Sequence, residues 1–280
     1  IKIKRDSEAR LGRPIDNVVI TVPAYFNRSQ RHATVEAGKL AGFDRIRLIN
    51  EPTAAALAFR LGREEQKVLV YDLGGGTFDV SIIEVDNGVY RVIASYGDMH
   101  LGGDNLDESI AAWLRKAFEA EYSFALPADD KSLRARLREA GEEAKIRLSE
   151  VESTEIHLPA LYTLAGQAYD LRATLSRGQM EAEIQGHIER TIDICKEALA
   201  KANEKDRLKG GLRPEDISQV LLVGGQSKTP AVRRALNRAF GWPLNDGVEP
   251  GLAVALGAGI VAGYESQDPY LRDEILLRDI

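Results

Sequence analysis

The stretch VYDLGGGTFDVSIIEV, residues 70–85, constrains the fold of this chain more than any other part of its sequence. Three consecutive glycines and Thr77 separate two runs rich in β-branched residues, and this pattern predicts two antiparallel strands joined by a tight turn. Because glycine has no Cβ, it adopts positive φ angles and lets backbone N–H groups approach a ligand, most often a phosphate. A plain hairpin turn is the alternative, but it needs only one or two such residues.

Two acidic residues flank the glycines and favour a metal ion at the turn. Asp72 ends the first run and Asp79 begins the second, so a hairpin brings both carboxylates to the same end. Beside bound phosphates they would repel the ligand unless a cation lay between them, and Mg²⁺ held largely through water suits that role. Either Asp alone would be more typical of a strand-end turn. No Lys follows the glycines and the next element reads as a strand, which excludes a Walker-type loop and a dinucleotide fingerprint.

The rest of the chain alternates between strand-like and helix-like segments. A third strand-forming run, residues 89–96, extends the hairpin into a meander. Asn27 and Gln30 have the spacing of a capping box, and Gly42 stands where that helix would end. Further strands are predicted at 18–22, 45–50, 157–176 and 219–225, and helices at 27–42, 51–62, 104–150, 178–203, 227–240 and about 250–264. Strand–helix units on both sides of a meander indicate a duplicated α/β architecture.

Composition excludes several classes of protein. The chain has 280 residues, 44% of them apolar, and a net charge of −6, so it can bury a large core and lacks the basic character of a nucleic-acid binder. Its longest uncharged run, residues 251–263, is too short to span a bilayer. The one cysteine, Cys195, rules out an internal disulfide, fits a reducing compartment and is expected in a helix core. Neither a metal-ligand spacing nor a Ser–His–Asp arrangement is predicted for the histidines at 32, 100, 157 and 187.

Five motifs, in one order along the chain, resemble the ATPase domain of the 70-kDa heat-shock chaperones, the DnaK-like family. They are VPAYFN at 22–27, INEPTAAALA at 49–58, DLGGGTFD at 72–79, HLGGDNLD at 100–107 and LLVGGQSKTP at 221–230. The resemblance covers essentially the whole chain. It implies an α/β fold of the actin/hexokinase type, with two ribonuclease H-like lobes that close over ATP, the first of them incomplete here.

The same resemblance divides the chain into six parts. They are a partial first lobe (1–66), second-lobe core with the hairpin (67–107), a helical and β subdomain over the nucleotide (108–190), more second-lobe core (191–246), a helix returning to the first lobe (247–265) and the start of a linker (266–280). A first glycine-rich hairpin and a catalytic Lys of the family find no match, so three strands of the first lobe are expected to be absent. We therefore expect an unpaired sheet edge, a first lobe that is disordered, self-associated or completed by another chain, and no ATP turnover by this fragment alone.

Site residues follow from the resemblance by position. The catalytic residues are expected to be Glu51, Asp72, Thr77 and Asp79, with Thr77 placing the reacting phosphoryl group and the three carboxylates holding the waters around Mg²⁺. Pro52 puts Glu51 at a helix N-terminus, where the dipole favours its ionised form, although simple capping is the alternative. Contacts to ATP or ADP are implied for Gly74, Gly75, Gly76, Thr77, Gly103, Glu142, Lys145, Ser149, Gly224, Gly225 and Lys228.

Helical spacing gives one of these groups independent support. Glu142, Lys145 and Ser149 fall on one helix face, and in the family this face binds the ribose and adenine. The opposite face carries an apolar stripe of Leu137, Ala140, Ala144 and Leu148. Without the resemblance, a charged helix face would be read as a solvated one.

The resemblance also implies partners. Pro23 and Arg31 match positions that relay the nucleotide state between lobes, whereas Arg47, Asn50 and Thr53 match a surface for J-domain co-chaperones and the interdomain linker. For Arg47, an exposed strand-end charge is an equal alternative. A nucleotide-exchange factor and unfolded polypeptides, bound through a domain not present here, are the other implied partners of a cytoplasmic protein with no nucleic-acid or membrane partner.

Two departures from the family pattern bear on the nucleotide. Lys228 stands where an Arg usually stacks on adenine, and Gly251 stands where an Asp is usual, so weaker or altered nucleotide binding is expected. These changes leave a degenerate nucleotide-binding regulator as one alternative, and an actin-like filament-forming ATPase is another. The dipeptide Phe78–Asp79 and the motifs VPAYFN and VGGQSKTP favour the chaperone over the filament protein.

Overall fold

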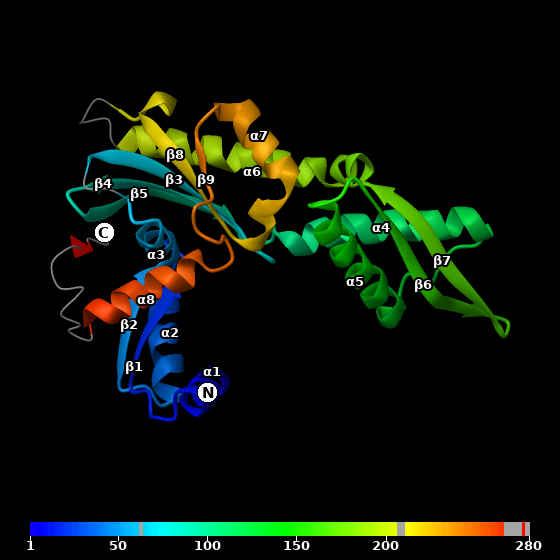
Figure 1. Cartoon of the computed structure of the whole chain (residues 1–280), viewed down its shortest axis with the longest axis horizontal. Helices are drawn as coiled ribbons and strands as arrows, with labels where there is room; N and C mark the ends of the chain where they lie inside the picture. The colour runs from blue at the N-terminus through cyan, green and yellow to red at the C-terminus, as the bar shows by residue number, and fades with distance from the viewer. Residues whose placement is uncertain (62–63, 206–210, 266–275, 278–280) are drawn as a thin grey trace.

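The structure is a computed structural model, and it describes residues 1–61, 64–205, 211–265 and 276–277. A body built around a six-stranded sheet continues into an arm that extends away from it (Figure 1). The helices are α1 (Lys2–Leu11), α2 (Arg28–Leu40), α3 (Glu51–Ala58), α4 (Gly103–Tyr122), α5 (Lys131–Leu148), α6 (Arg177–Lys205), α7 (Pro230–Phe240) and α8 (Ala253–Glu265), with short 3₁₀ helices η2 (Pro214–Asp216) and η3 (Gly225–Lys228). The strands are β1 (Asn17–Val22), β2 (Arg45–Asn50), β3 (Gln66–Leu73), β4 (Phe78–Asp86), β5 (Val89–Asp98), β6 (Ser153–Leu164), β7 (Gln167–Ser176), β8 (Ile217–Val223), β9 (Leu244–Asn245) and β10 (Leu276–Leu277).

The six-stranded sheet carries the predicted meander at its centre. Its strand order is β10-β5-β4-β3-β8-β9, with β3, β4 and β5 antiparallel to one another in turn and β8 parallel to β3. Asp72 lies opposite Asp79 in the register of β3 and β4, so the hairpin brings both carboxylates to one end of the sheet, as expected. Because β3 and β8 are parallel, the turn after β8 emerges at this same end.

Alternation along the strands gives the sheet two apolar faces, each covered by helices. On one face the Tyr71 hydroxyl donates a hydrogen bond to Thr191 of α6 at 2.8 Å, inside the larger core. On the other face Val70 packs with α3 and α8, which lie below the sheet in Figure 1. These two helices approach each other so closely that a Cβ on Gly257 of α8 would lie 1.7 Å from the carbonyl oxygen of Ala54 in α3.

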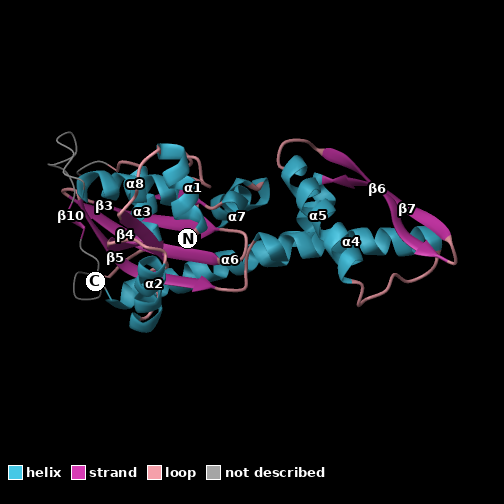
Figure 2. Cartoon of the chain, turned by 90° about the horizontal axis from the view of Figure 1, so that it is seen from below, coloured by secondary structure: helices cyan, strands magenta, loops and turns pink. Residues whose placement is uncertain are grey.

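The arm consists of α4, α5 and the hairpin β6–β7, and α6 connects it to the sheet (Figure 2). Helix α6 contacts α4 and β7 in the arm and β4 and β5 in the sheet, so one continuous core runs through both parts. Near the arm's end the rings of Phe118, Tyr122 and Tyr169 pack together, with centroids 4.7 and 5.0 Å apart along the series. The long helix therefore fixes the position of α4 and α5 relative to the glycine-rich turn.

The strands β1 and β2 form a separate parallel sheet, and within the described chain they pair only with each other. Asn27 caps α2 as predicted: its side chain accepts from the Gln30 N–H at 3.0 Å, and the Gln30 side chain accepts from the Asn27 N–H at 2.9 Å. Burial is low here, with Val22 buried in β1, and Ile49 and Asn50 buried in β2. The expected self-association, disorder or completion of this lobe stays a prediction.

The glycines of the turn do not adopt the expected backbone conformation. None of Gly74, Gly75 and Gly76 has a positive φ angle, whereas Gly224, which follows β8, has a φ of 79°. The expectation that this turn uses the left-handed backbone that glycine permits was therefore wrong. The absence of a side chain instead leaves the backbone of the turn open to a ligand, because an added Cβ at 75 or 76 would meet no protein atom within 4 Å.

Two predicted elements have different limits in the structure. The segment predicted as short strands forms the long hairpin β6–β7, which starts at Ser153, and its residues Thr154 and Ile156 are buried. The helix predicted from residue 227 begins at Pro230, which lacks an N–H and suits the first helical turn. Of the predicted linker, 266–275 and 278–280 lie outside the described residues, and the six domain limits stay predictions. No helix in the described parts of the chain is both long and apolar enough to cross a membrane.

Candidate functional site

Three carboxylates, those of Glu51, Asp72 and Asp79, meet at the end of the sheet that carries the glycine-rich turn. Asp72 and Asp79 face each other across β3 and β4, and Glu51 is the first residue of α3, which packs against the same strands. Together with Pro23 they line a cavity of about 10 Å³. Three of the four residues predicted to be catalytic are therefore brought together, and Thr77 is exposed in the turn beside them.

Burial makes these carboxylates unusually weak acids. Desolvation, together with the Asp79 and Glu51 carboxylates, raises the pKa of Asp72 to about 7. Desolvation and the Asp79 carboxylate raise the pKa of Glu51 to about 6, so burial outweighs the helix dipole that was expected to favour ionisation. Desolvation raises the pKa of Asp79 to about 6, although hydrogen bonds from the hydroxyls of Tyr25 and Thr77 lower it. Near neutral pH the cluster can therefore both hold and accept protons.

Tyr25 is a site residue that the sequence reasoning missed. Burial and the nearby Asp79 carboxylate raise its pKa, so its hydroxyl stays protonated and can donate to Asp79. The available signal was its place in the motif VPAYFN, two residues after Pro23. That motif was used for the resemblance, but no role followed for the tyrosine because its long-range partner Asp79 is not visible in a linear pattern.

The donor set at this cluster fits a hydrated divalent cation. Asp79 Oδ1 is buried and has no hydrogen-bond partner within the described residues. Ionising all three acids together would place like charges side by side, and a cation relieves that repulsion. Among residues 1–61, 64–205, 211–265 and 276–277, no three acidic, His or Cys side chains are placed to ligate a metal directly.

A second glycine-containing loop packs directly on the turn. The Gly103 N–H donates to the Gly74 carbonyl at 3.0 Å, and the Asp104 N–H donates to the Gly75 carbonyl at 2.7 Å. A Cβ on Gly102 would lie 2.6 Å from the Gly75 carbonyl oxygen, a separation that no real side chain tolerates. Glycine at 102 is therefore required for the start of α4 to support the turn.

The third loop follows β8 and contacts the end of β3. A Cβ on Gly224 would lie 2.3 Å from the Leu73 carbonyl oxygen and 2.6 Å from Asp72 Oδ1. By contrast, Gly75 and Gly76 are exposed, and nothing in the folded chain occupies the positions of their missing side chains. The protein itself does not need glycine at 75 and 76, so the bare backbone there leaves room for a ligand.

The predicted base- and sugar-binding face of α5 does not present its three residues alike. Glu142 is exposed, while Ser149 is half-buried and donates to the Lys145 carbonyl of its own helix at 3.1 Å. The Lys145 ammonium is buried and pairs with Asp107 of α4 at 2.6 Å. The apolar stripe on the other side is buried as predicted; it comprises Leu137, Ala140, Ala144 and Leu148.

Lys228 and Gly251, the two departures from the family pattern, lie on either side of one carboxylate. Lys228 ends η3, which begins at Gly225 directly after the third glycine loop, and its ammonium pairs with Glu249. This contact and the Gly251 N–H lower the pKa of Glu249. The lysine is therefore charge-neutralised at the rim of the site.

Arg31, which together with Pro23 was predicted to relay the nucleotide state, contacts residues next to the same cavity. Arg31 donates to the backbone carbonyls of Ala24 and Phe26 and to the Asn50 side chain, the last at 2.5 Å. Thr53 is buried in α3, and its hydroxyl has no hydrogen-bond partner among the described residues.

Arg47 lies elsewhere, on the exposed surface of β2. There it lines a groove of about 460 Å³ together with Arg13 and Arg45. The structure thus places Arg31 beside a residue that lines the cavity, Ala24, whereas Arg47 lines a different groove.

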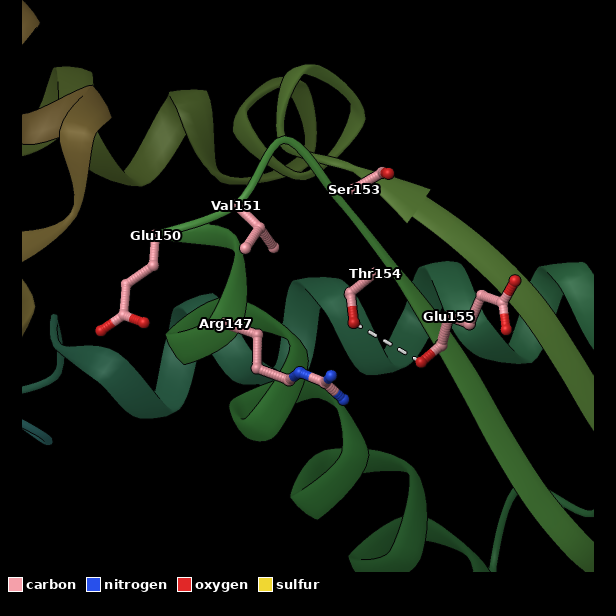
Figure 3. A pocket seen from close by; sticks show the side chains of 6 residues that line it. All are labelled: Arg147, Glu150, Val151, Ser153, Thr154 and Glu155. Carbon is pink, nitrogen blue, oxygen red and sulfur yellow. Dashed lines mark hydrogen bonds between the residues drawn. The ribbon is translucent and has the colours of Figure 1, made fainter.

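A larger hollow, about 660 Å³, lies where α5 ends and β6 begins. Figure 3 shows the side chains around it: Arg147, Glu150, Val151, Ser153, Thr154 and Glu155. In this view the carboxylates of Glu150 and Glu155 point away from each other, and the only interaction drawn joins neighbouring residues 154 and 155. The hollow has volume but no converging polar groups, so we place the site at the glycine loops.

Comparison with known proteins places the chain in a family. The family model described as Hsp70 protein matches residues 1–280. Proteins called "Chaperone protein DnaK" from Thermosipho africanus and Thermosipho melanesiensis are each 46% identical over 263 residues, which is 93% of this chain and 42% and 43% of theirs. The mitochondrial "Heat shock 70 kDa protein" of Pisum sativum is 45% identical over 279 residues, all of this chain and 40% of that protein. The chain thus spans about two fifths of the length of these relatives, and its α/β fold and five motifs agree with the match: the chain belongs to the Hsp70 family.

Proposed function

We propose that the chain binds ATP and ADP together with Mg²⁺, as the nucleotide-binding part of a chaperone that hydrolyses ATP as a full-length protein. The observation that carries this proposal is the juxtaposition of three weakly acidic carboxylates with the open backbone of Gly75 and Gly76. Exposed backbone N–H groups suit phosphate oxygens, and carboxylates beside them suit a cation. Family membership supports the same function and does not favour the filament alternative.

Each group at the cluster has a role that its surroundings support. Mg²⁺, held mainly through water by Asp72, Asp79 and Glu51, would supply positive charge that offsets the charge of the phosphates. Exposed Thr77 orients the terminal phosphoryl group from the mouth of the turn. With a pKa of about 6, Glu51 can accept a proton from an attacking water at neutral pH. Catalysis of phosphoryl transfer depends mainly on such positioning and electrostatics.

The remaining nucleotide contacts are assigned to the loops and to α5. Gly74, Gly103, Gly224 and Gly225 supply backbone around the phosphates. The ribose and base are bound by a second group of side chains, namely Glu142, Lys145, Ser149 and Lys228. Because Lys228 pairs with Glu249 and cannot stack as an Arg does, we expect base recognition to be weaker than in relatives with Arg. The same pairing keeps a nucleotide-binding regulator without turnover as the second candidate function.

Partners of the whole protein are part of the proposal. The two Thermosipho relatives are named as chaperones, and by analogy this chain serves a chaperone whose nucleotide state controls its hold on unfolded polypeptides. Arg31 and Pro23, beside the cavity, suit a relay of the nucleotide state between lobes. Arg47, Asn50 and Thr53 are assigned to a surface for J-domain co-chaperones and the interdomain linker, and a nucleotide-exchange factor completes the cycle. We assign the protein to the cytoplasm, although one relative is mitochondrial.

Thermal unfolding of the chain with nucleotides tests the proposal. At a ligand concentration of 100 times Kd, binding to the folded form alone adds about 2.7 kcal/mol to the free energy of unfolding, enough for a rise of several degrees in Tm. We expect this rise with ATP and Mg²⁺ and a smaller one with GTP and Mg²⁺. Equal shifts would contradict adenine recognition, and no shift with either nucleotide would refute nucleotide binding. Release of phosphate by the full-length protein, measured in parallel, separates the ATPase from the regulator.

A further inference from the structure

The only charged pair in the described chain whose two side chains are both almost fully buried joins α4 to α5. Lys145 Nζ lies 2.6 Å from Asp107 Oδ1, and the two side chains are 2% and 4% exposed. Neither atom has a hydrogen-bond partner in addition to this ion pair within the described residues. An ammonium group carries three donors, so Lys145 keeps donor capacity that the folded chain leaves unused.

The buried pair of Lys145 and Asp107 differs in exposure from the other ion pairs between α4 and α5. Two other ion pairs, Glu108 with Arg134 and Asp104 with Arg138, cross the same interface, but their side chains are 44% to 65% exposed. Such exposed pairs contribute ~0–1 kcal/mol to stability. Near the buried pair the helices are in close contact, because a Cβ on Gly141 would lie 3.0 Å from the Asp107 carbonyl oxygen. The backbones of α4 and α5 are thus in close contact beside this ion pair.

Asp107 is also linked to the glycine-rich turn through a short run of helix. The first two residues of α4 donate backbone N–H groups to the carbonyls of Gly74 and Gly75, at 3.0 and 2.7 Å. Asp107 follows Gly103 by four residues, which is about one helical turn. The position of the Lys145 ammonium is therefore set by the same helix end that supports the turn.

Removing the carboxylate charge would change the state of the lysine. Desolvation raises the pKa of Asp107, whereas the hydrogen bond and the charge of the Lys145 ammonium lower it. The other charges that act on this pair are the carboxylates of Asp104 on α4 and Glu142 on α5. Without a buried counter-ion an enclosed lysine loses its proton more easily or leaves its place.

We propose that Asp107 is a positioning residue of the nucleotide site: it keeps Lys145 charged and in place, so that the unused donors of its ammonium reach the anionic ligand held at the glycine-rich turn. This inference rests on the proposed function, because it requires that the turn binds a nucleotide. It adds Asp107, for which the sequence reasoning gave no role, and it explains why a binding lysine is buried between two helices instead of exposed at the surface.

The test measures ATP affinity of the chain with Mg²⁺ at pH 6.5 and pH 8.5, each variant being compared with the wild type at the same pH. For Asp107→Asn we expect about tenfold weaker binding at pH 8.5 and partial recovery at pH 6.5, where the isolated lysine regains its proton. Glu108→Gln, which breaks an exposed pair at the same interface, is the matched control and should bind like the wild type. Unchanged affinity of Asp107→Asn at both pH values would overturn the proposal.

A double variant separates positioning from folding. In Asp107→Leu with Lys145→Met an apolar pair replaces the ion pair, so the interface keeps its packing without charge. We expect wild-type Tm within a few degrees, weak ATP binding and no recovery at pH 6.5. Wild-type affinity in this variant, or the same recovery at low pH as in Asp107→Asn, would overturn the proposal even if the single variant failed to fold. Absence of ATP binding by the wild type would instead refute the proposed function itself.

Discussion

Replacing Asp72 with Asn is expected to stabilise the protein at pH 8 and to change little at pH 4. In the folded chain the pKa of Asp72 is raised from 3.8 to about 7, so between these values the folded form holds a proton that the unfolded form has lost. The stability contributed by this group is fully present below pH 4 and is lost as the pH rises through 7. At pH 8 the wild type therefore contains a buried charge that Asn would remove.

The size of the effect follows from the shift. A rise from 3.8 to about 7 corresponds to about 4 kcal/mol at roughly 1.4 kcal/mol per pKa unit. Part of this is recovered when Asp79 and Glu51 take up protons instead, and the Asn amide is itself buried, so we expect a gain of about 2 kcal/mol. Because Mg²⁺ relieves the same repulsion, it should stabilise the wild type at pH 8 more than it stabilises the variant.

Urea unfolding at pH 4 and pH 8, with and without Mg²⁺, measures these differences as shifts in the denaturation midpoint. Asp86→Asn is a matched control, because Asp86 is an exposed acid at the other end of β4. Its effect should stay within about 0.5 kcal/mol at both pH values. A variant at Asp72 that is no more stable than the wild type at pH 8, or equally stabilised at pH 4, would refute the assigned burial of this carboxylate.

Three further predictions concern the glycine-rich turn and the contact between α3 and α8. In the full-length protein, Thr77→Ala and Glu51→Ala should slow single-turnover ATP hydrolysis more than they weaken ATP binding, and a large affinity loss with an unchanged rate would contradict their roles. Gly102→Ala should lower both ATP affinity and stability, by about 1–3 kcal/mol for the latter, since its Cβ would meet the backbone of the turn. Gly257→Ala should be more destabilising still in thermal unfolding, whereas Gly186→Ala, at an open helix position, should stabilise by about 0.5–1 kcal/mol.

Local sequence patterns predicted the elements around the site well. The meander, the alternation of strands and helices before it, and the cap formed by Asn27 all depend on neighbours in sequence, and the structure confirms each. The meeting of Asp72 and Asp79 was predictable for the same reason, because a hairpin fixes its own register.

What sequence reasoning could not supply depends on contacts between distant segments. The steric need for glycine at 102 and 224 arises from approach to backbone far along the chain, and the same holds for Tyr25 beside Asp79. Likewise, helical spacing placed Lys145 on the same face as Glu142. It could not predict that Asp107 on α4 would pair with this lysine, because that contact joins two separate helices. The backbone of the turn was mistaken because three glycines permit a left-handed conformation without requiring it.

The parallel pairing of β3 with β8 has a consequence for the order in which the site can assemble. Lys67 pairs with Ile217, so the two strands that deliver the turn and the third glycine loop are separated by most of the chain. During synthesis at ~5–20 residues per second, the hairpin leaves the ribosome many seconds before its parallel partner does. Through that interval β3 is an edge strand with an apolar face, open to pairing with other chains. The residues of the arm lie between β3 and β8 in the sequence, so the whole arm is synthesised before β8. Its length therefore delays the pairing of β3 with β8 and the formation of the site that the arm supports.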